Sequence, residues 1–187
     1  MSKKLFCIIG RTSSGKTSLT KEVAKQLNLK VVKSYTTRPL RPGEIEEESD
    51  HYFISEDTYP KYQRDIIAYT EINGYRYFAT KKELDKSDIY VIDPKGFYEL
   101  LYWYSIRKIQ TQPIPIYIYL PDPLGYIRAC DRGDNMEVWL KRNKSEDGQF
   151  KDFEAIVEDT SMYSINNNIF EDSIERLKNI IAKEQGS

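Results

Sequence analysis

Histidine, cysteine and long apolar runs are scarce in this 187-residue chain, and each scarcity excludes a class of protein. The single histidine, His51, excludes a multi-histidine metal site and leaves little for a histidine-dependent hydrolase. The two cysteines, Cys7 and Cys130, lack metal-ligand spacing, and we expect reduced structural thiols. No apolar run approaches the roughly 20 residues of a membrane-spanning helix. The first one, 5–9, is short for a signal peptide, so we expect a cytoplasmic protein that does not act at a membrane.

A strong net charge is also absent. The 28 lysines and arginines nearly balance the 29 aspartates and glutamates, which gives a formal net charge of −1. Such a surface provides no field that would hold a nucleic acid, so we expect no nucleic-acid partner and only a local basic site. The length fits one domain with insertions. Chemistry would therefore depend on lysine, arginine, hydroxyl groups and backbone amides.

Patterns of short buried strands alternate with helical patterns. Strands are expected at 5–9, 89–93 and 114–120, and helices at 16–28 and 96–108. Strands that alternate with helices are joined by crossover connections. The order predicts an α/β fold, with a parallel sheet between two layers of helices.

Two stretches do not follow this alternation of buried strands and helices. Residues 34–86 are Tyr-rich, polar-alternating and broken by proline and glycine, which predicts an inserted, partly β subdomain. Residues 133–148 are charged and are expected to be rich in loops, followed by a helix at 150–161, a short strand and a final amphipathic helix. Tyr98, Tyr102 and Trp103 recur at helical spacing, and we expect them on a core-facing side of their helix.

Residues 10–17, GRTSSGKT, fit the phosphate-loop pattern G-x-x-x-x-G-K-[ST] between a strand and a helix. The glycines let successive N–H groups face inward, and the helix N-terminus adds partial positive charge, so a cradle for nucleotide phosphates is predicted. Lys16 would reach the β- and γ-phosphates of ATP, and the Thr17 hydroxyl would ligate Mg²⁺. The residues expected to bind the nucleotide here are Gly10, Thr12, Ser13, Ser14, Gly15, Lys16, Thr17 and Ser18.

Asp93 ends the second buried strand. A carboxylate there can orient Mg²⁺-bound water opposite the phosphate loop, which makes Asp93 a second metal candidate. An aspartate before Pro94 is equally the pattern of a helix cap. The sequence leaves both roles open.

Residues 34–44, SYTTRPLRPGE, place Arg38 and Arg41 three residues apart in a segment stiffened by proline. Guanidiniums bind a phosphate bidentately, and prolines reduce the entropy lost on ordering. Here the chain resembles the guanylate kinases, whose acceptor-binding segment reads S-x-T-T-R-x-x-R-x-G-E. The matching residues are Ser34, Thr36, Thr37, Arg38, Arg41, Gly43 and Glu44.

The resemblance covers most of the chain and implies one guanylate kinase-like domain over residues 1–187. Its implied parts are a core of 1–33, 87–124 and 150–187, an acceptor-binding subdomain of 34–86 and a lid of 125–149. It also implies phosphoryl transfer from ATP, with Mg²⁺, to a small-molecule nucleoside monophosphate. We expect a monomer or a homodimer.

The resemblance also implies roles for single residues. In guanylate kinases the arginines of the lid close over the phosphates, and Arg128 and Arg132 here share a helix face, with Arg132 expected to bind ATP. His51 stands where the family has a tyrosine. The expected catalytic residues are Lys16, Arg38, Arg128 and Arg142. The residues expected to hold the acceptor are Ser34, Arg38, Arg41, His51, Glu71 and Tyr77.

The base-reading positions depart from the family. Guanine is normally read by two carboxylates and by hydroxyl groups, whereas this chain has Ala68, Val91 and Ala79 at three of those positions and retains Ser34. The carboxylates accept hydrogen bonds from guanine, so losing both is expected to remove most discrimination, about a few kcal/mol. Glu71 could substitute through a shifted register. The acceptor is therefore expected to be GMP, dGMP or another nucleoside or deoxynucleoside monophosphate.

Two other functions compete with this prediction. Residues 93–96 match the D-x-x-G of GTPases and 143–146 nearly match N-K-x-D, so a phosphate-loop GTPase or ATPase is one alternative. A base-reading N-K-x-D should end a buried strand, but residues 137–142 have a helical texture. The other alternative is a non-catalytic module that binds a phosphopeptide through Arg38 and Arg41. Such modules typically carry a degraded phosphate loop, whereas the loop of this chain is intact.

Overall fold

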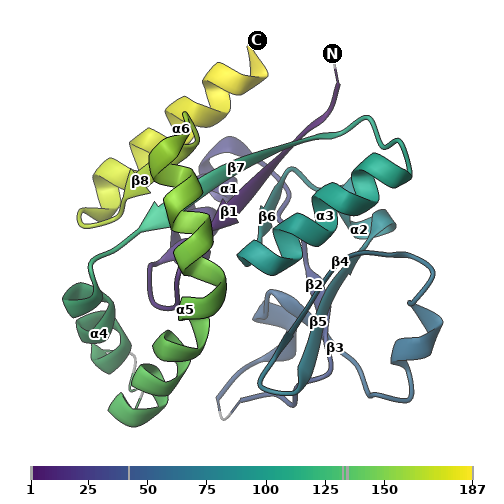
Figure 1. Ribbon diagram of the computed structural model, residues 1–187, viewed down its shortest axis with the longest axis horizontal. Helices are drawn as coiled ribbons and strands as arrows, with labels where there is room; N and C mark the ends of the chain where they lie inside the picture. Colours follow the sequence, from purple (N-terminus) through teal and green to yellow (C-terminus); the bar gives the residue numbers. More distant parts are fainter. Residues whose placement is uncertain (1, 42, 132, 134, 187) are drawn as a thin grey trace.

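The computed structural model describes residues 2–41, 43–131, 133 and 135–186, and within them the strands form two four-stranded sheets (Figure 1). The first sheet is parallel throughout, with the order β6 (Ile89–Val91), β1 (Lys4–Ile9), β7 (Gln112–Tyr119) and β8 (Tyr163–Asn166). The second is mixed, with the order β3 (His51–Phe53), β2 (Ser34–Thr36), β5 (Tyr75–Thr80) and β4 (Ile66–Ile72). The α-helices are α1 (Lys16–Leu27), α2 (Lys81–Asp85), α3 (Pro94–Ile106), α4 (Asp122–Asp131), α5 (Met136–Asp159) and α6 (Phe170–Gln185). Two 3-10 turns connect strands of the second sheet along the chain. The first, η1 (Glu46–Glu48), lies between β2 and β3, and the second, η2 (Tyr59–Lys61), lies between β3 and β4.

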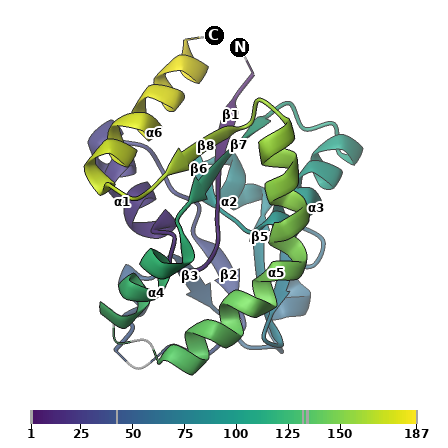
Figure 2. The same ribbon diagram turned by 60° about the vertical axis from the view of Figure 1, so that its left-hand side comes forward.

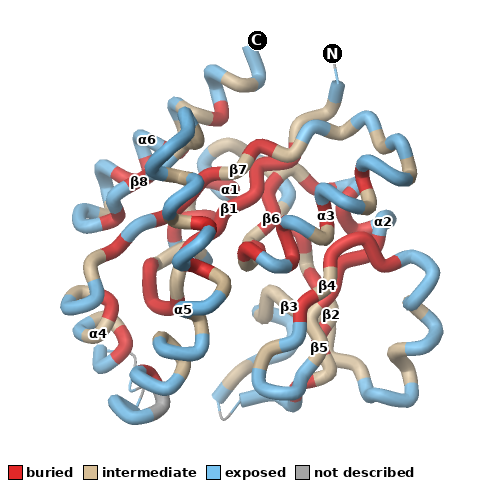
Figure 3. The backbone as a smooth tube through the Cα atoms, viewed as in Figure 1, coloured by how far each residue is buried: buried red, intermediate tan, exposed pale blue. Residues whose placement is uncertain are grey.

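The parallel sheet has a helical layer on each face, which confirms the three-layer α/β fold. Alternate side chains of β1 point to opposite faces. Phe6 and Ile8 pack with Leu19 of α1 and Leu177 of α6, in a cluster that forms one core. Leu5, Cys7 and Ile9 belong to a second core, to which α3 and α5 contribute. The most buried stretches of the chain therefore follow the central strands (Figure 3).

The second sheet has two chemically different faces. Cross-strand partners share a face, and neighbours along a strand alternate between faces. Tyr35 pairs with Tyr52 and Phe78, and their rings pack with Tyr62. The opposite face carries Ser34, Thr36, His51, Phe53, Thr70, Tyr77, Ala68 and Ala79. This second face, which we call the acceptor face, holds three of the six residues expected to bind the acceptor, namely Ser34, His51 and Tyr77.

Helix α5 corrects the prediction for residues 133–148. Instead of a loop-rich stretch, one continuous helix runs from Met136 to Asp159, so the expected boundary between lid and core at 149/150 falls inside it. Asn135 caps the helix by accepting a hydrogen bond from the Glu137 amide. Figure 2 shows α5 running from its contact with α4 to the side of α3. Its polar residues find partners in other parts of the chain, which local pattern cannot reveal.

The expected core position of two tyrosines is also wrong. Tyr98 and Tyr102 are 44% and 57% exposed, because the buried face of α3 is formed by Phe97, Leu100 and Tyr104. The described residues include no helix of sufficient length and apolar character to cross a membrane.

Candidate active site

The phosphate loop joins β1 to α1, and two of its glycines are required by geometry. A Cβ at Gly10 would lie 2.5 Å from the Ile118 carbonyl oxygen of β7. Gly15 has a left-handed φ of 86° and leads directly into α1. The loop therefore packs against the central strands and leads directly into the N-terminus of α1, which is the setting of a phosphate-binding loop.

The other residues of the loop and of the turn that follows it differ in how far they are buried. Thr12, Ser13 and Ser14 are buried, whereas Thr17 and Ser18 on the first turn of α1 are exposed. The Lys16 ammonium donates to the Arg11 carbonyl at 2.6 Å, so it is folded over the loop. This ammonium is in position to meet a phosphate held by the loop.

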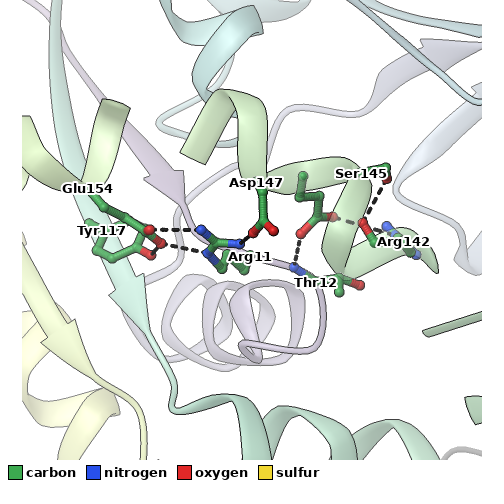
Figure 4. A network of polar contacts seen from close by, with 8 residues as sticks. Arg11, Thr12, Tyr117, Arg142, Ser145, Asp147 and Glu154 are labelled. Atoms are coloured by element: carbon green, nitrogen blue, oxygen red, sulfur yellow. Dashed lines mark hydrogen bonds and ion pairs between the residues drawn. The ribbon is translucent and has the colours of Figure 1, made fainter. Parts of the chain in front are cut away.

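Helix α5 contacts three successive residues of the loop, of which Figure 4 shows Arg11 and Thr12. Arg11 binds Glu154 through Nε at 2.7 Å and through Nη2 at 2.8 Å, and it binds Asp147 through Nη1 at 2.6 Å. The Thr12 amide donates to Glu146 at 2.7 Å. The Trp139 indole N–H donates to the Ser13 hydroxyl at 3.1 Å. Sequence reasoning missed these α5 partners, because nothing in a helical stretch marks which carboxylate meets a distant loop.

Arg128 reaches the loop through a second residue that sequence reasoning missed. The fully buried Asn167, at the end of β8, donates from Nδ2 to the Ser14 carbonyl at 2.7 Å. Arg128 of α4 donates to the Asn167 carbonyl at 2.7 Å, and its Nη1 would lie 3.1 Å from a Cβ at Gly15. The run of asparagines at 166–168 was the available signal, since such residues often bond to backbone groups at the ends of strands.

Arg38 is held by a carboxylate on the acceptor side. Its side chain is 8% exposed and binds Glu44 through Nη1 at 2.6 Å and Nη2 at 2.7 Å, while the guanidinium stacks over Phe53. Glu44 also accepts from the Arg41 amide and the Ser49 hydroxyl. The Arg38 hydrogen bonds are the main reason that the pKa of Glu44 is lowered to about 2. A charged bidentate pair thus fixes the orientation of Arg38.

Three guanidiniums from two parts of the chain act on one another here. Partial burial lowers the pKa of Arg41, and the positive charges of Arg38 and Arg142 lower it further. Arg142 belongs to α5, and its Nε lies 3.6 Å from Glu146. In the described part of the chain the Arg41 guanidinium has no hydrogen bond or ion pair of its own. Positive charges placed together in this way are stabilised by an anionic ligand.

Ser34, His51 and Tyr77 lie together on the acceptor face. The Ser34 hydroxyl and His51 Nδ1 are 2.8 Å apart, and the rings of His51 and Tyr77 meet edge to face at 5.5 Å. Burial, followed by the positive charge of Arg38, lowers the pKa of His51 to about 4. The imidazole is therefore neutral at pH 7 and can exchange hydrogen bonds without adding charge.

Glu71 does not join this group, which corrects the idea of a shifted register. Ala68 and Ala79 pair directly across β4 and β5 and are buried, whereas Glu71 pairs with Arg76. Residues three apart on a strand point to opposite faces. Glu71 is accordingly exposed on the other face, where the Tyr69 hydroxyl donates to it. The acceptor face thus has apolar side chains at the positions that would read a base.

Asp93 fills one of the two roles that the sequence left open, that of a helix cap. Its Oδ1 accepts from the Gly96 amide at 2.7 Å and caps α3. Its Oδ2 is buried and has no hydrogen-bond partner among the described residues. Burial raises the pKa of Asp93, and the bond from the Gly96 amide opposes that rise. A buried carboxylate oxygen, near enough to Lys16 and to the Thr70 hydroxyl for both to oppose the rise in its pKa, fits the ligand set of Mg²⁺, which needs only one or two protein oxygens beside phosphates and water.

Comparison with known proteins agrees with this geometry. A family model described as guanylate kinase matches residues 2–184. The chain belongs to the guanylate kinase family. It is 29% identical over 199 aligned positions to a guanylate kinase of Thermotoga maritima, covering 99% of this chain and 89% of that protein. It is 31% identical over 202 positions to a guanylate kinase of Psychrobacter arcticus, covering 99% and 88%.

A solved structure supports the fold. The guanylate kinase of Anaplasma phagocytophilum superposes with a TM-score of 0.67 at 24% identity, covering 100% of this chain and 88% of that one. Membership of the guanylate kinase family confirms the resemblance and makes the chain an enzyme of the nucleoside monophosphate kinase type. The near match to N-K-x-D lies inside α5 and not at a strand end, which removes the structural basis of the GTPase alternative. Arg132, expected to bind ATP, lies outside the described residues.

Proposed function

We propose that the enzyme transfers the γ-phosphoryl group of ATP to a nucleoside monophosphate bound between the acceptor face and α5. The observation that carries the proposal is the position of the Arg41 guanidinium, which has no hydrogen bond or ion pair among the described residues and lies near enough to Arg38 and Arg142 for their charges to lower its pKa. The phosphate loop would bind the phosphates of ATP, and these guanidiniums would bind the phosphate of the acceptor. Two phosphate sites in one protein are what phosphoryl transfer between nucleotides requires.

The catalytic work is positioning and charge neutralisation. The attacking atom is an anionic phosphate oxygen, so no general base is needed. Lys16, Arg128 and Arg142 would stabilise the charge on the moving phosphoryl group. Arg38, oriented by Glu44, and Arg41 would hold the acceptor phosphate against its repulsion by the donor.

Residues of this chain would also hold Mg²⁺. The Thr17 hydroxyl and the Asp93 carboxylate are the proposed groups, supported by the unpartnered Oδ2 of Asp93. When bound, Mg²⁺ neutralises part of the charge on the donor phosphates. The Asp93 bond to the Gly96 amide fixes the direction of the carboxylate at the start of α3.

The acceptor is GMP, dGMP or another nucleoside or deoxynucleoside monophosphate. Relatives named guanylate kinases favour guanine. The paired Ala68 and Ala79, and Val91 at the end of β6, offer no hydrogen bond to a base edge. We therefore propose a broad acceptor range, in which phosphate contacts provide most of the binding and the base little of the selectivity.

A coupled ADP-release assay across the common ribo- and deoxyribonucleoside monophosphates tests the activity and its range. We expect turnover that depends on an added monophosphate, with GMP less than about tenfold preferred over other bases. ADP release without any monophosphate, or faster turnover of GTP than of ATP as donor, would show the proposed reaction to be wrong. GMP preferred by about a hundredfold or more would leave the reaction intact but contradict the broad range.

Arg41→Ala tests the acceptor site itself. Because the Arg41 guanidinium has no hydrogen bond or ion pair with any described residue, its removal should raise the KM of the monophosphate at least about tenfold while leaving the fold and the KM of ATP unchanged. Arg176→Ala on α6 is the matched control. Equal changes in both KM values would contradict the assigned role.

A further inference from the structure

Arg11 is an arginine inside the phosphate loop, and its side chain turns away from the cradle into α5 (Figure 4). The side chain is 19% exposed, and its guanidinium lies over the Phe150 ring at 5.4 Å. Two parallel bonds to Glu154 and one to Asp147 use all three nitrogens. Such a bidentate pair fixes distance and angle together, which a single bond does not.

We call the bonds of the Arg11 side chain to Glu154 and Asp147 the clamp. Through Glu154 the clamp continues into the central sheet. The Tyr117 hydroxyl of β7 donates to the same Glu154 carboxylate. Tyr117 is buried and pairs in register with Ile9, the last residue of β1 before the loop. The sequence of contacts Tyr117–Glu154–Arg11 therefore ties α5 both to the sheet and to the loop.

Arg11 acts on catalytic groups at both ends of this clamp. Its backbone carbonyl accepts from the Lys16 ammonium at 2.6 Å. Its partner Asp147 follows Arg142 by five residues on the same continuous helix. The backbone of one loop residue thus contacts the catalytic lysine, while its side chain holds the helix that carries the α5 arginine.

We propose that Arg11 is a positioning residue for phosphoryl transfer, which docks α5 on the phosphate loop so that Arg142 and the loop amides meet the same donor phosphates. Arg11 touches no reacting atom in this role. Its removal leaves the loop motif and Arg142 in place but loosens the alignment between them. Misplacement of about 1 Å between catalytic groups can reduce a rate by up to about a hundredfold.

Steady-state kinetics of Arg11→Ala, with ATP and the monophosphate varied in turn, provide the main test. We expect the KM of ATP to rise about tenfold and kcat to fall about tenfold, with the KM of the monophosphate within about twofold of wild type. Arg11→Lys should recover little, because an ammonium cannot make the two parallel bonds to Glu154. Arg107→Ala, which removes an arginine that stacks on Trp103 far along the chain, is the matched control and should change none of these values.

A double-mutant cycle distinguishes positioning from loss of stability. If Arg11 acts through Arg142, adding Arg11→Ala to Arg142→Ala should change kcat by less than about twofold. Effects that multiply in the double variant would overturn the proposal, as would an Arg11→Ala enzyme with unchanged kcat and KM of ATP. If Arg11→Ala does not fold, Glu154→Gln weakens the clamp and takes its place in the same cycle.

The inference rests on the proposed reaction. Calorimetric measurement of Mg-ATP binding distinguishes failure of the inference from failure of the proposed reaction. Wild type without monophosphate-dependent turnover would refute the proposed function. The dissociation constant of Mg-ATP would still decide the role of Arg11, because an aligned loop binds ATP about tenfold more tightly than a loosened one. Equal constants for wild type and Arg11→Ala would overturn the inference.

Discussion

Acid should destabilise this protein through His51 in a pH range that its buried position defines. The imidazole lies on the acceptor face, bonded to Ser34 and packed against Tyr77. Burial is the main cause that lowers its pKa from 6.5 to about 4, and the charges of Arg38 and Arg41 act in the same direction. Asp50 and Glu44 act in the opposite direction and do not overcome the effect.

The sign follows from proton binding. Between pH 6.5 and 4 the unfolded chain binds a proton at His51 that the folded chain does not bind, so the free energy of unfolding falls as the pH falls through this range. With these two pKa values the loss is about 1.4 kcal/mol at pH 5.5 and about 2.5 kcal/mol at pH 4.5, relative to pH 7.5. Below the folded pKa the contribution no longer changes.

Urea denaturation of wild type and His51→Phe at several pH values measures this contribution. Other titrating groups are common to both proteins, so the difference between their unfolding free energies isolates His51. Phenylalanine also leaves the Ser34 hydroxyl without its partner, but that loss is the same at every pH. We expect wild type to lose about 2.5 kcal/mol relative to the variant between pH 7.5 and 4.5. Parallel stability curves would refute the assignment of a buried neutral histidine.

Two further predictions concern residues outside the site. Gly148→Ala should raise the unfolding free energy by up to about 1 kcal/mol, because a Cβ there meets nothing within 4 Å and alanine favours the helix; a loss of stability in urea would contradict this. Ellman's reagent should modify one thiol in the native protein and two after denaturation, because Cys130 is exposed whereas Cys7 is buried and burial raises its thiol pKa. Two fast-reacting native thiols would show that β1 is not buried as described.

Sequence patterns were sufficient for the central layer and for the two local motifs that we propose to bind phosphates. Apolar runs at 5–9 and 114–120 correspond to β1 and β7, because a strand buried on both faces needs an apolar residue at almost every position. The phosphate loop and the segment 34–44 are local motifs whose residues act within a few positions of one another. The pair of Arg38 and Glu44, six residues apart, lies within such a motif.

Helix α5 could not be predicted in the same way. Its stretch from 136 to 148 is charged and contains glycine, features typical of an exposed loop. The helix is held by contacts to residues more than a hundred positions away, such as Glu154 with Arg11 and Trp139 with Ser13. Tertiary contacts of this kind override local propensity and leave no periodic signal.

Recognition of the base depends on strand register, which explains why the acceptor is harder to infer than the reaction. A phosphate can be bound by groups on one loop, whereas in the acceptor site that we propose a base edge would meet side chains from β4, β5 and β6 at once. The register that pairs Ala68 with Ala79 places two methyl groups together and sends Glu71 to the opposite face. A one-residue slip would reverse those positions, so an alanine-for-glutamate change cannot be offset by a carboxylate an odd number of residues away. On β4, only a residue at an even spacing from Ala68, such as Thr70, can present a polar group on the acceptor face.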